Sequence, residues 1–135
     1  MSKEALFNVL NNHFNFDELK VLDLFSGTGN ISYEFGSRGS QNITSVDADF
    51  GCVKFIKQTA AEFDFNIAAI KSDVLQYIDK CKTQYDLIFA DPPYGFEQAT
   101  FEKIVTSVFQ NELLAEEGMM VIEHSKYTKL EHLEH

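Results

Sequence analysis

The apolar positions of the chain fall into short buried runs that alternate with amphipathic stretches. Five runs have the length and composition of β-strands, and they cover residues 20–25, 42–47, 66–70, 85–90 and 119–123. Between them apolar residues recur every three or four positions, which predicts helices over 3–12, up to about 38, 48–63, just after 73 and around 101–109. This alternation indicates an α/β fold with a mostly parallel sheet that is covered on both faces.

Polar residues gather where the predicted strands end. The glycine turn at 26–29 follows the first strand, Asp47 ends the second, Asp73 lies just beyond the third, and Asp91 directly follows the fourth. The carboxyl ends of parallel strands meet at one edge of a sheet, where open α/β sheets bind their ligands. We therefore expect these four features to form one site.

The glycine turn and Asp47 fit a nucleoside ligand. Gly27 and Gly29 let the backbone turn tightly and approach a ligand, although Ser32 stands where a dinucleotide fingerprint has its third glycine. Asp47 lies 18 residues beyond Gly29, close to the ~20 at which an acid commonly bonds ribose hydroxyls. The alternatives are a plain strand-to-helix turn and a helix-capping carboxylate, a role that Asp49 can also fill.

Asp73 has two compatible interpretations. Its carboxylate can accept a hydrogen bond from an adenine amino group, while the backbone of Val74 meets the ring. Alternatively, Ser72 or Asp73 is the N-cap of the helix that follows.

The most specific motif is Asp91-Pro92-Pro93-Tyr94. Two prolines cannot continue a sheet ladder, because each lacks an N–H and has a fixed φ, so the strand ends with Asp91 at its tip. A carboxylate, two carbonyl groups and an aromatic face then share one rigid turn, which suits a planar ligand with an amino group. The alternative is an ordinary proline turn.

Composition limits the classes of function. A length of 135 residues predicts one domain, residues 1–135, and no apolar run approaches the ~18 residues of a membrane span, so we expect a cytoplasmic protein without membrane contact. The two cysteines, Cys52 and Cys81, and the four histidines lack metal-ligand spacing, so we expect no metal site. The net charge of −10 does not indicate a basic surface for nucleic acid. The substrate is therefore not a polyanion, or phosphate groups are held by a local patch or by a part outside this sequence.

Taken in order, these motifs resemble the S-adenosylmethionine-dependent amino-group methyltransferases of the Rossmann-like class. The segments at 3–8 (KEALFN) and 23–29 (DLFSGTG) make the chain similar to the RsmD type over residues 3 to about 127. That type methylates the exocyclic N2 of a guanine in small-subunit ribosomal RNA. The resemblance implies a three-layer sandwich with strand order 3-2-1-4-5 and ribosomal RNA or the small ribosomal subunit as partner.

The resemblance also assigns roles to residues. It places the cofactor, S-adenosylmethionine, against Asp23, Phe25, Ser26, Gly27, Thr28, Gly29, Asn30, Asp47, Ala48, Asp73, Val74 and Asp91. It places the target base against Asp91, Pro92, Pro93 and Tyr94, with Asp91 and the Pro92 carbonyl accepting the amino hydrogens and Tyr94 stacking on the flipped base. Acidic residues suit a cationic sulfonium, whereas a dinucleotide's pyrophosphate would be repelled.

The chain departs from the family pattern at both ends. RsmD-type proteins normally carry a basic N-terminal arm and two further strands after the fifth, so we expect a truncated version whose fifth strand is an open edge. Beyond that strand, Ser125, Lys126, Tyr127 and Lys129 either touch RNA phosphates or form a solvated tail.

Three other functions stay open at this point. They are adenine-N6 methylation of DNA, non-catalytic binding of the cofactor or a partner, and, more distantly, nicotinamide-dependent redox chemistry. Glutamine methylation is disfavoured, because such enzymes usually have Asn in place of Asp91.

Overall fold

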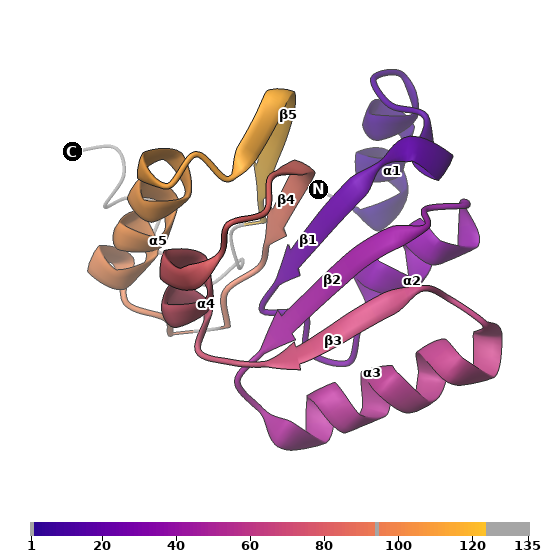
Figure 1. The fold of residues 1–135 in the computed structure, drawn as a ribbon, viewed down its shortest axis with the longest axis horizontal. Helices are drawn as coiled ribbons and strands as arrows, with labels where there is room; N and C mark the ends of the chain where they lie inside the picture. The colour runs from indigo at the N-terminus through magenta and orange to yellow at the C-terminus, as the bar shows by residue number, and fades with distance from the viewer. Residues whose placement is uncertain (1, 94, 124–135) are drawn as a thin grey trace.

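The computed structural model describes residues 2–93 and 95–123, and it shows a five-stranded sheet between two layers of helices (Figure 1). The strands are β1 (Lys20–Leu24), β2 (Asn42–Asp47), β3 (Ile67–Lys71), β4 (Tyr85–Ala90) and β5 (Leu114–Ile122). All neighbouring strands pair in parallel, in the order β3-β2-β1-β4-β5. The Rossmann-like three-layer architecture and the strand order that we predicted are confirmed.

The helices divide between the two faces of the sheet (Figure 1). One face carries α1 (Lys3–Asn11), α2 (Asn30–Ser37) and α3 (Phe50–Phe63), and the other carries α4 (Val74–Lys80) and α5 (Gln98–Gln110). A short 3₁₀ helix, η1 (Phe16–Glu18), was not predicted and leads from α1 into β1. Side chains of Ser2, Asp49 and Asp73 accept backbone N–H groups at the starts of α1, α3 and α4, as N-caps do.

Alternating side chains of each strand build two cores. On β4, Leu87 and Phe89 pack toward α1 and α2, whereas Ile88 and Ala90 pack toward α4 and α5. On the first of these faces, the rings of Phe7 and Phe35 lie edge to face with centroids 4.7 Å apart. Burying each such side chain stabilises the fold by about 1.5–3 kcal/mol relative to leaving it exposed. Packing on both faces therefore holds the strands, and the ends from which the loops start, in fixed positions.

The structure corrects the start of the fifth strand. We predicted residues 119–123, but β5 begins at Leu114 and contains an irregularity. Tyr85 pairs with Leu114 and Leu87 with Met119, so β5 advances five residues while β4 advances two. The extra residues include the polar pair at 116–117. This pair interrupts the apolar pattern, so the sequence did not predict the first half of the strand.

At its outer edge β5 pairs with no other strand among residues 2–93 and 95–123. Ser125, Lys126, Tyr127 and Lys129, for which we predicted a role at this edge, lie outside the described residues.

No helix in the described part of the chain is long and apolar enough to cross a membrane.

Candidate active site

A pocket of about 440 Å³ lies at the carboxyl ends of β1 to β4. Its walls come from the loops that follow these strands: Phe25, Gly27, Asp47, Ala48, Asp73, Val74, Asp91, Pro93 and Phe96. The structure therefore brings together residues of the glycine turn, the three strand-end acids and the proline turn, as the sequence predicted. Phe96 is the member that sequence reasoning missed.

Asp47 is fixed by two backbone amides. The Gly27 N–H donates to Oδ2 at 2.8 Å, and the Asp49 N–H donates to Oδ1 at 2.9 Å. Asp49, not Asp47, caps α3 by accepting the Cys52 N–H at 2.8 Å. Each oxygen of Asp47 has a further lone pair, so the carboxylate is oriented and can still accept hydrogen bonds from ligand hydroxyls.

The turn after β1 has a left-handed backbone at three positions, Phe25 (φ 58°), Gly27 (φ 56°) and Gly29 (φ 93°). A Cβ at Gly27 would meet no atom within 4 Å, and Gly27 faces the pocket. A Cβ at Gly29 would lie 2.6 Å from the ring of Tyr33. Gly27 thus leaves room for a ligand, while Gly29 lets α2 pack closely. For Phe25 this backbone conformation costs about 1–3 kcal/mol, which is typical of ligand sites.

Asp23 lies beneath the turn and does not line the pocket. It is buried on β1 and accepts a hydrogen bond from Ser32 Oγ of α2 at 2.7 Å, and Ser32 also bonds Ser45 of β2. Burial raises the pKa of Asp23 to about 7, although the Ser32 bond works against the rise, and the charge of Asp91 adds to it. Ser32, at the third-glycine position of a dinucleotide fingerprint, thus ties α2 to β1 and β2.

Asp73 caps α4 and also faces the pocket. Its Oδ2 accepts the Gln76 N–H at 3.1 Å, while the buried Val74 contributes an apolar wall. The Ser72 N–H bonds the Asp47 carbonyl at 3.0 Å, which holds the loop after β3 against the end of β2. Capping is therefore observed, and contact with an adenine ring stays a prediction.

Asp91 stands at the tip of β4, beside the buried Pro92 and the exposed Pro93. Partial burial raises the pKa of the Asp91 carboxyl, and the charge of Glu123 raises it further. The Phe96 N–H closes the proline turn by donating to the Pro93 carbonyl at 3.1 Å.

The same turn supplies an aromatic wall. The rings of Phe96 and Phe25 lie edge to face with centroids 5.1 Å apart, so two loops distant in sequence meet over the pocket. In the sequence, the only sign of this contact was an aromatic residue shortly after the proline turn. Tyr94, the predicted stacking residue, lies outside the described residues.

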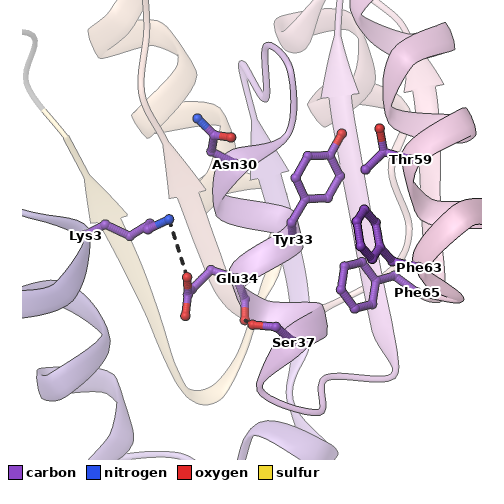
Figure 2. Close-up of a pocket in the computed structure, with 8 residues that line it drawn as sticks. All are labelled: Lys3, Asn30, Tyr33, Glu34, Ser37, Thr59, Phe63 and Phe65. Carbon is purple, nitrogen blue, oxygen red and sulfur yellow. Dashed lines mark hydrogen bonds and ion pairs between the residues drawn. The ribbon is translucent and has the colours of Figure 1, made fainter.

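A second pocket, of about 370 Å³, lies between α1, α2 and α3 (Figure 2). It is lined by Lys3, Asn30, Tyr33, Glu34, Ser37, Thr59, Phe63 and Phe65, so Asn30 lines this pocket and not the first. Lys3 Nζ lies 3.4 Å from Glu34 Oε1. Figure 2 shows this ion pair, and it shows Phe63 beside Phe65. The charges of Lys3 and Glu34 neutralise each other, and aromatic side chains form part of the wall. The strand-end carboxylates of the first pocket are not among its described lining residues. Ser26, Thr28, Gly29 and Pro92 line neither pocket.

The first pocket offers hydrogen-bond acceptors together with aromatic side chains. Asp47, Asp73 and Asp91 offer carboxylates to hydroxyl and amino groups, and Phe25 and Phe96 offer apolar surface. Such a set fits a cationic, hydroxyl-bearing ligand with a planar ring, and its size is that of ordinary ligand sites. Among the residues that the structure describes, no three His, Cys, Asp or Glu side chains are grouped to hold a metal ion.

Comparison with known proteins identifies a matching family model and several similar proteins. The family model described as conserved hypothetical protein 95 matches residues 1–135. A candidate rRNA methyltransferase of Bacillus subtilis, YlbH, is 30% identical over 133 residues, which cover 95% of this chain and 70% of that protein.

Two further similarities agree with this match. The ribosomal RNA small subunit methyltransferase D of Buchnera aphidicola is 27% identical, over 90% of this chain and 61% of that protein. The structure of a candidate methyltransferase, yhhF, from Escherichia coli has a TM-score of 0.82 at 24% identity and covers 90% of this chain and 66% of that one. The chain thus spans about two thirds of the length of these proteins.

Proposed function

Because the chain belongs to the family described as conserved hypothetical protein 95, the RsmD family, we propose that it transfers a methyl group from S-adenosylmethionine to the exocyclic N2 of a guanine in small-subunit ribosomal RNA. One observation carries the proposal. Asp91, at the tip of β4, lines the same pocket as the glycine turn and the acids that follow β2 and β3. This arrangement would put an acceptor for the target amine at the edge of the pocket that would hold the methyl donor.

The pocket residues fit this cofactor. Asp47, oriented by the amides of Gly27 and Asp49, would hold the ribose hydroxyls. Asp73 and the buried Val74 would meet the adenine, and Phe25 and Gly27 of the turn after β1 would lie against the methionine part. The buried Asp23 would act from beneath, by holding α2 and its glycine turn in place through Ser32.

The target amine needs help from the protein. The exocyclic nitrogen of guanine gives its lone pair to the ring and is a poor nucleophile. Asp91 and the Pro92 carbonyl would accept its two hydrogens and so turn the lone pair toward the methyl donor. Orientation of this kind contributes several kcal/mol, on the order of 7 or more in ideal systems. Tyr94 would stack on the base.

S-adenosylmethionine, when bound, supplies a methyl group on a sulfonium sulfur, which keeps the C–S bonding pair and becomes a neutral thioether. On the target, the N2 lone pair forms the new N–C bond, and one N2 hydrogen leaves as a proton. Asp91 would receive that proton, because its raised pKa makes it a better base than an ordinary aspartate. Water then takes the proton from Asp91.

The test is the identity of the methylated nucleoside. The protein is incubated with the cofactor and unmodified small-subunit RNA or subunits, and the RNA is hydrolysed to nucleosides. We expect N2-methylguanosine. N6-methyladenosine alone would overturn the proposal in favour of adenine methylation. Calorimetry that shows cofactor binding without methyl transfer to any nucleic acid would support a binding role, and tight NAD binding that excludes S-adenosylmethionine would support a redox enzyme.

A further inference from the structure

We propose that Glu123 is the second carboxylate of the target-base site, and that it selects guanine by accepting the N1–H hydrogen while Asp91 accepts from N2. The inference rests on the proposed function and adds to it the means by which guanine is distinguished from other bases. Glu123 follows β5 directly and was not among the site residues predicted from the sequence.

The strand register places Glu123 beside Asp91. Ala90, the last residue of β4, pairs with Ile122, the last residue of β5, and the Glu123 N–H donates to the Ala90 carbonyl at 2.9 Å. Asp91 and Glu123 are therefore the residues that directly follow the last pair of the ladder. Neighbouring strands lie about 4.8 Å apart, so the two acids begin from adjacent strand ends.

The topology leaves this side of Asp91 for the target base. The cofactor pocket takes its walls from the loops after β1, β2, β3 and β4, and none of its lining residues belongs to β5. On the side of Asp91 opposite this pocket, the neighbouring strand is β5, and we infer that the base is held there. Glu123 is the residue that directly follows that strand.

The two carboxylates suit the edge of guanine. Burial raises the pKa of the Asp91 carboxyl, and the charge of Glu123 raises it further, as a neighbouring acid does. Guanine presents N1–H and N2–H donors side by side, so one base can satisfy both acids. Adenine presents one amino donor beside an N1 lone pair, which would face a carboxylate without a hydrogen bond, and such mismatches are costly in a desolvated site.

The test uses RNA in which the methylated guanine, located first by mapping the wild-type product, is replaced by 2-aminopurine. This base keeps the 2-amino group but has a lone pair at N1. We expect the wild type to prefer guanine by at least about tenfold in kcat/KM. Glu123→Gln should lower that preference by about tenfold, because the amide can donate to the N1 lone pair. 2-Aminopurine also lacks the O6 of guanine. Because this loss affects the wild type and Glu123→Gln alike, it cancels when their base preferences are compared.

Glu116→Gln is the matched control, because Glu116 is an exposed acid on β5, the strand that Glu123 follows. It should keep the wild-type preference, and cofactor binding by calorimetry should be unchanged in both variants. If Glu123→Gln does not fold, Glu123→Ala carries the same test and should also lose the preference.

An unchanged guanine preference in a folded Glu123 variant would overturn this inference and leave the proposed function standing. A wild type that forms no N2-methylguanosine would overturn both.

Discussion

Asp23 and Asp91 both have raised pKa values, but their surroundings give them different roles. Asp91 is partly open to the pocket and close to a second acid, Glu123. Asp23 is buried, accepts from Ser32 and never reaches the pocket. The motif that contains Asp23 suggested contact with the cofactor, whereas the structure shows a residue that ties β1 to α2.

The buried Asp23 should make stability depend on pH. Its carboxyl ionises near pH 3.8 in an unfolded chain and at about 7 in the folded protein. The folded state therefore holds the proton more tightly, so the stabilising contribution is complete below pH 3.8 and is lost as pH rises through about 7. Asp23→Asn removes this titration and keeps an acceptor for Ser32.

Relative to the wild type, Asp23→Asn should gain stability as pH rises from about 4 to about 8, by up to the order of 4 kcal/mol. Urea unfolding at several pH values measures the difference, and Asp79→Asn, at an exposed position of α4, is the control. A stability difference that does not change with pH would show that Asp23 titrates alike in both states.

Phe96 is predicted to support cofactor binding. Its ring packs on Phe25 at the wall of the pocket, so Phe96→Ala removes apolar surface from the ligand and frees the Phe25 loop. We expect the Kd for S-adenosylmethionine to rise by roughly tenfold, the equivalent of about 1.4 kcal/mol. Calorimetry compares it with Phe109→Ala, a residue 57% exposed on α5. Equal affinities of the two variants would contradict the assigned wall.

At the scale of elements, most of the fold could be predicted because apolar periodicity is a local signal. β2 and β4 have the predicted bounds, Asp47 ends β2, and Asp91 directly follows β4. What failed depends on contacts between distant segments. The irregular start of β5 is set by pairing with β4, and the contact of Phe96 with Phe25 is set by how two loops meet.

The close packing at the start of α2 can be tested at Gly29, the residue that precedes this helix. Gly29 and Gly39 both have positive φ values, 93° and 104°, but only Gly29 has a side chain against it, with Tyr33 2.6 Å from an added Cβ. Alanine at either position pays the backbone cost, and only Gly29→Ala also displaces Tyr33. We expect Gly29→Ala to lose at least about 1 kcal/mol more than Gly39→Ala in urea unfolding. Equal losses would show that the Tyr33 contact relaxes freely.

For the whole molecule, the net charge disfavours RNA binding, whereas the pocket depends on its acidic residues. The sequence has 21 acidic residues against 11 Lys and Arg, so its overall field opposes RNA. The pocket, in contrast, needs its acids for the cofactor and the amine. We therefore expect specificity to reside at Asp91 and its neighbours, with little affinity from the rest of this chain.

Binding of small-subunit RNA by this chain should accordingly be weak, with a Kd on the order of 10⁻⁵ M or weaker at physiological salt. Because few phosphates are neutralised, the affinity should fall only slightly between about 50 and about 200 mM salt. Fluorescence anisotropy with labelled RNA measures both quantities. Nanomolar binding with a steep salt dependence would reveal a basic surface that the sequence does not indicate.

The most direct measurement of the proposed function is transfer of a labelled methyl group from S-adenosylmethionine to unmodified small-subunit RNA by the wild type, Asp91→Ala and the exposed-site control Asp79→Ala. We predict label in N2-methylguanosine with the wild type and the control. Asp91→Ala should lower kcat at least about a hundredfold, because the amine loses its orienting acceptor. Transfer by Asp91→Ala at the wild-type rate, or label in another nucleoside, would contradict the account.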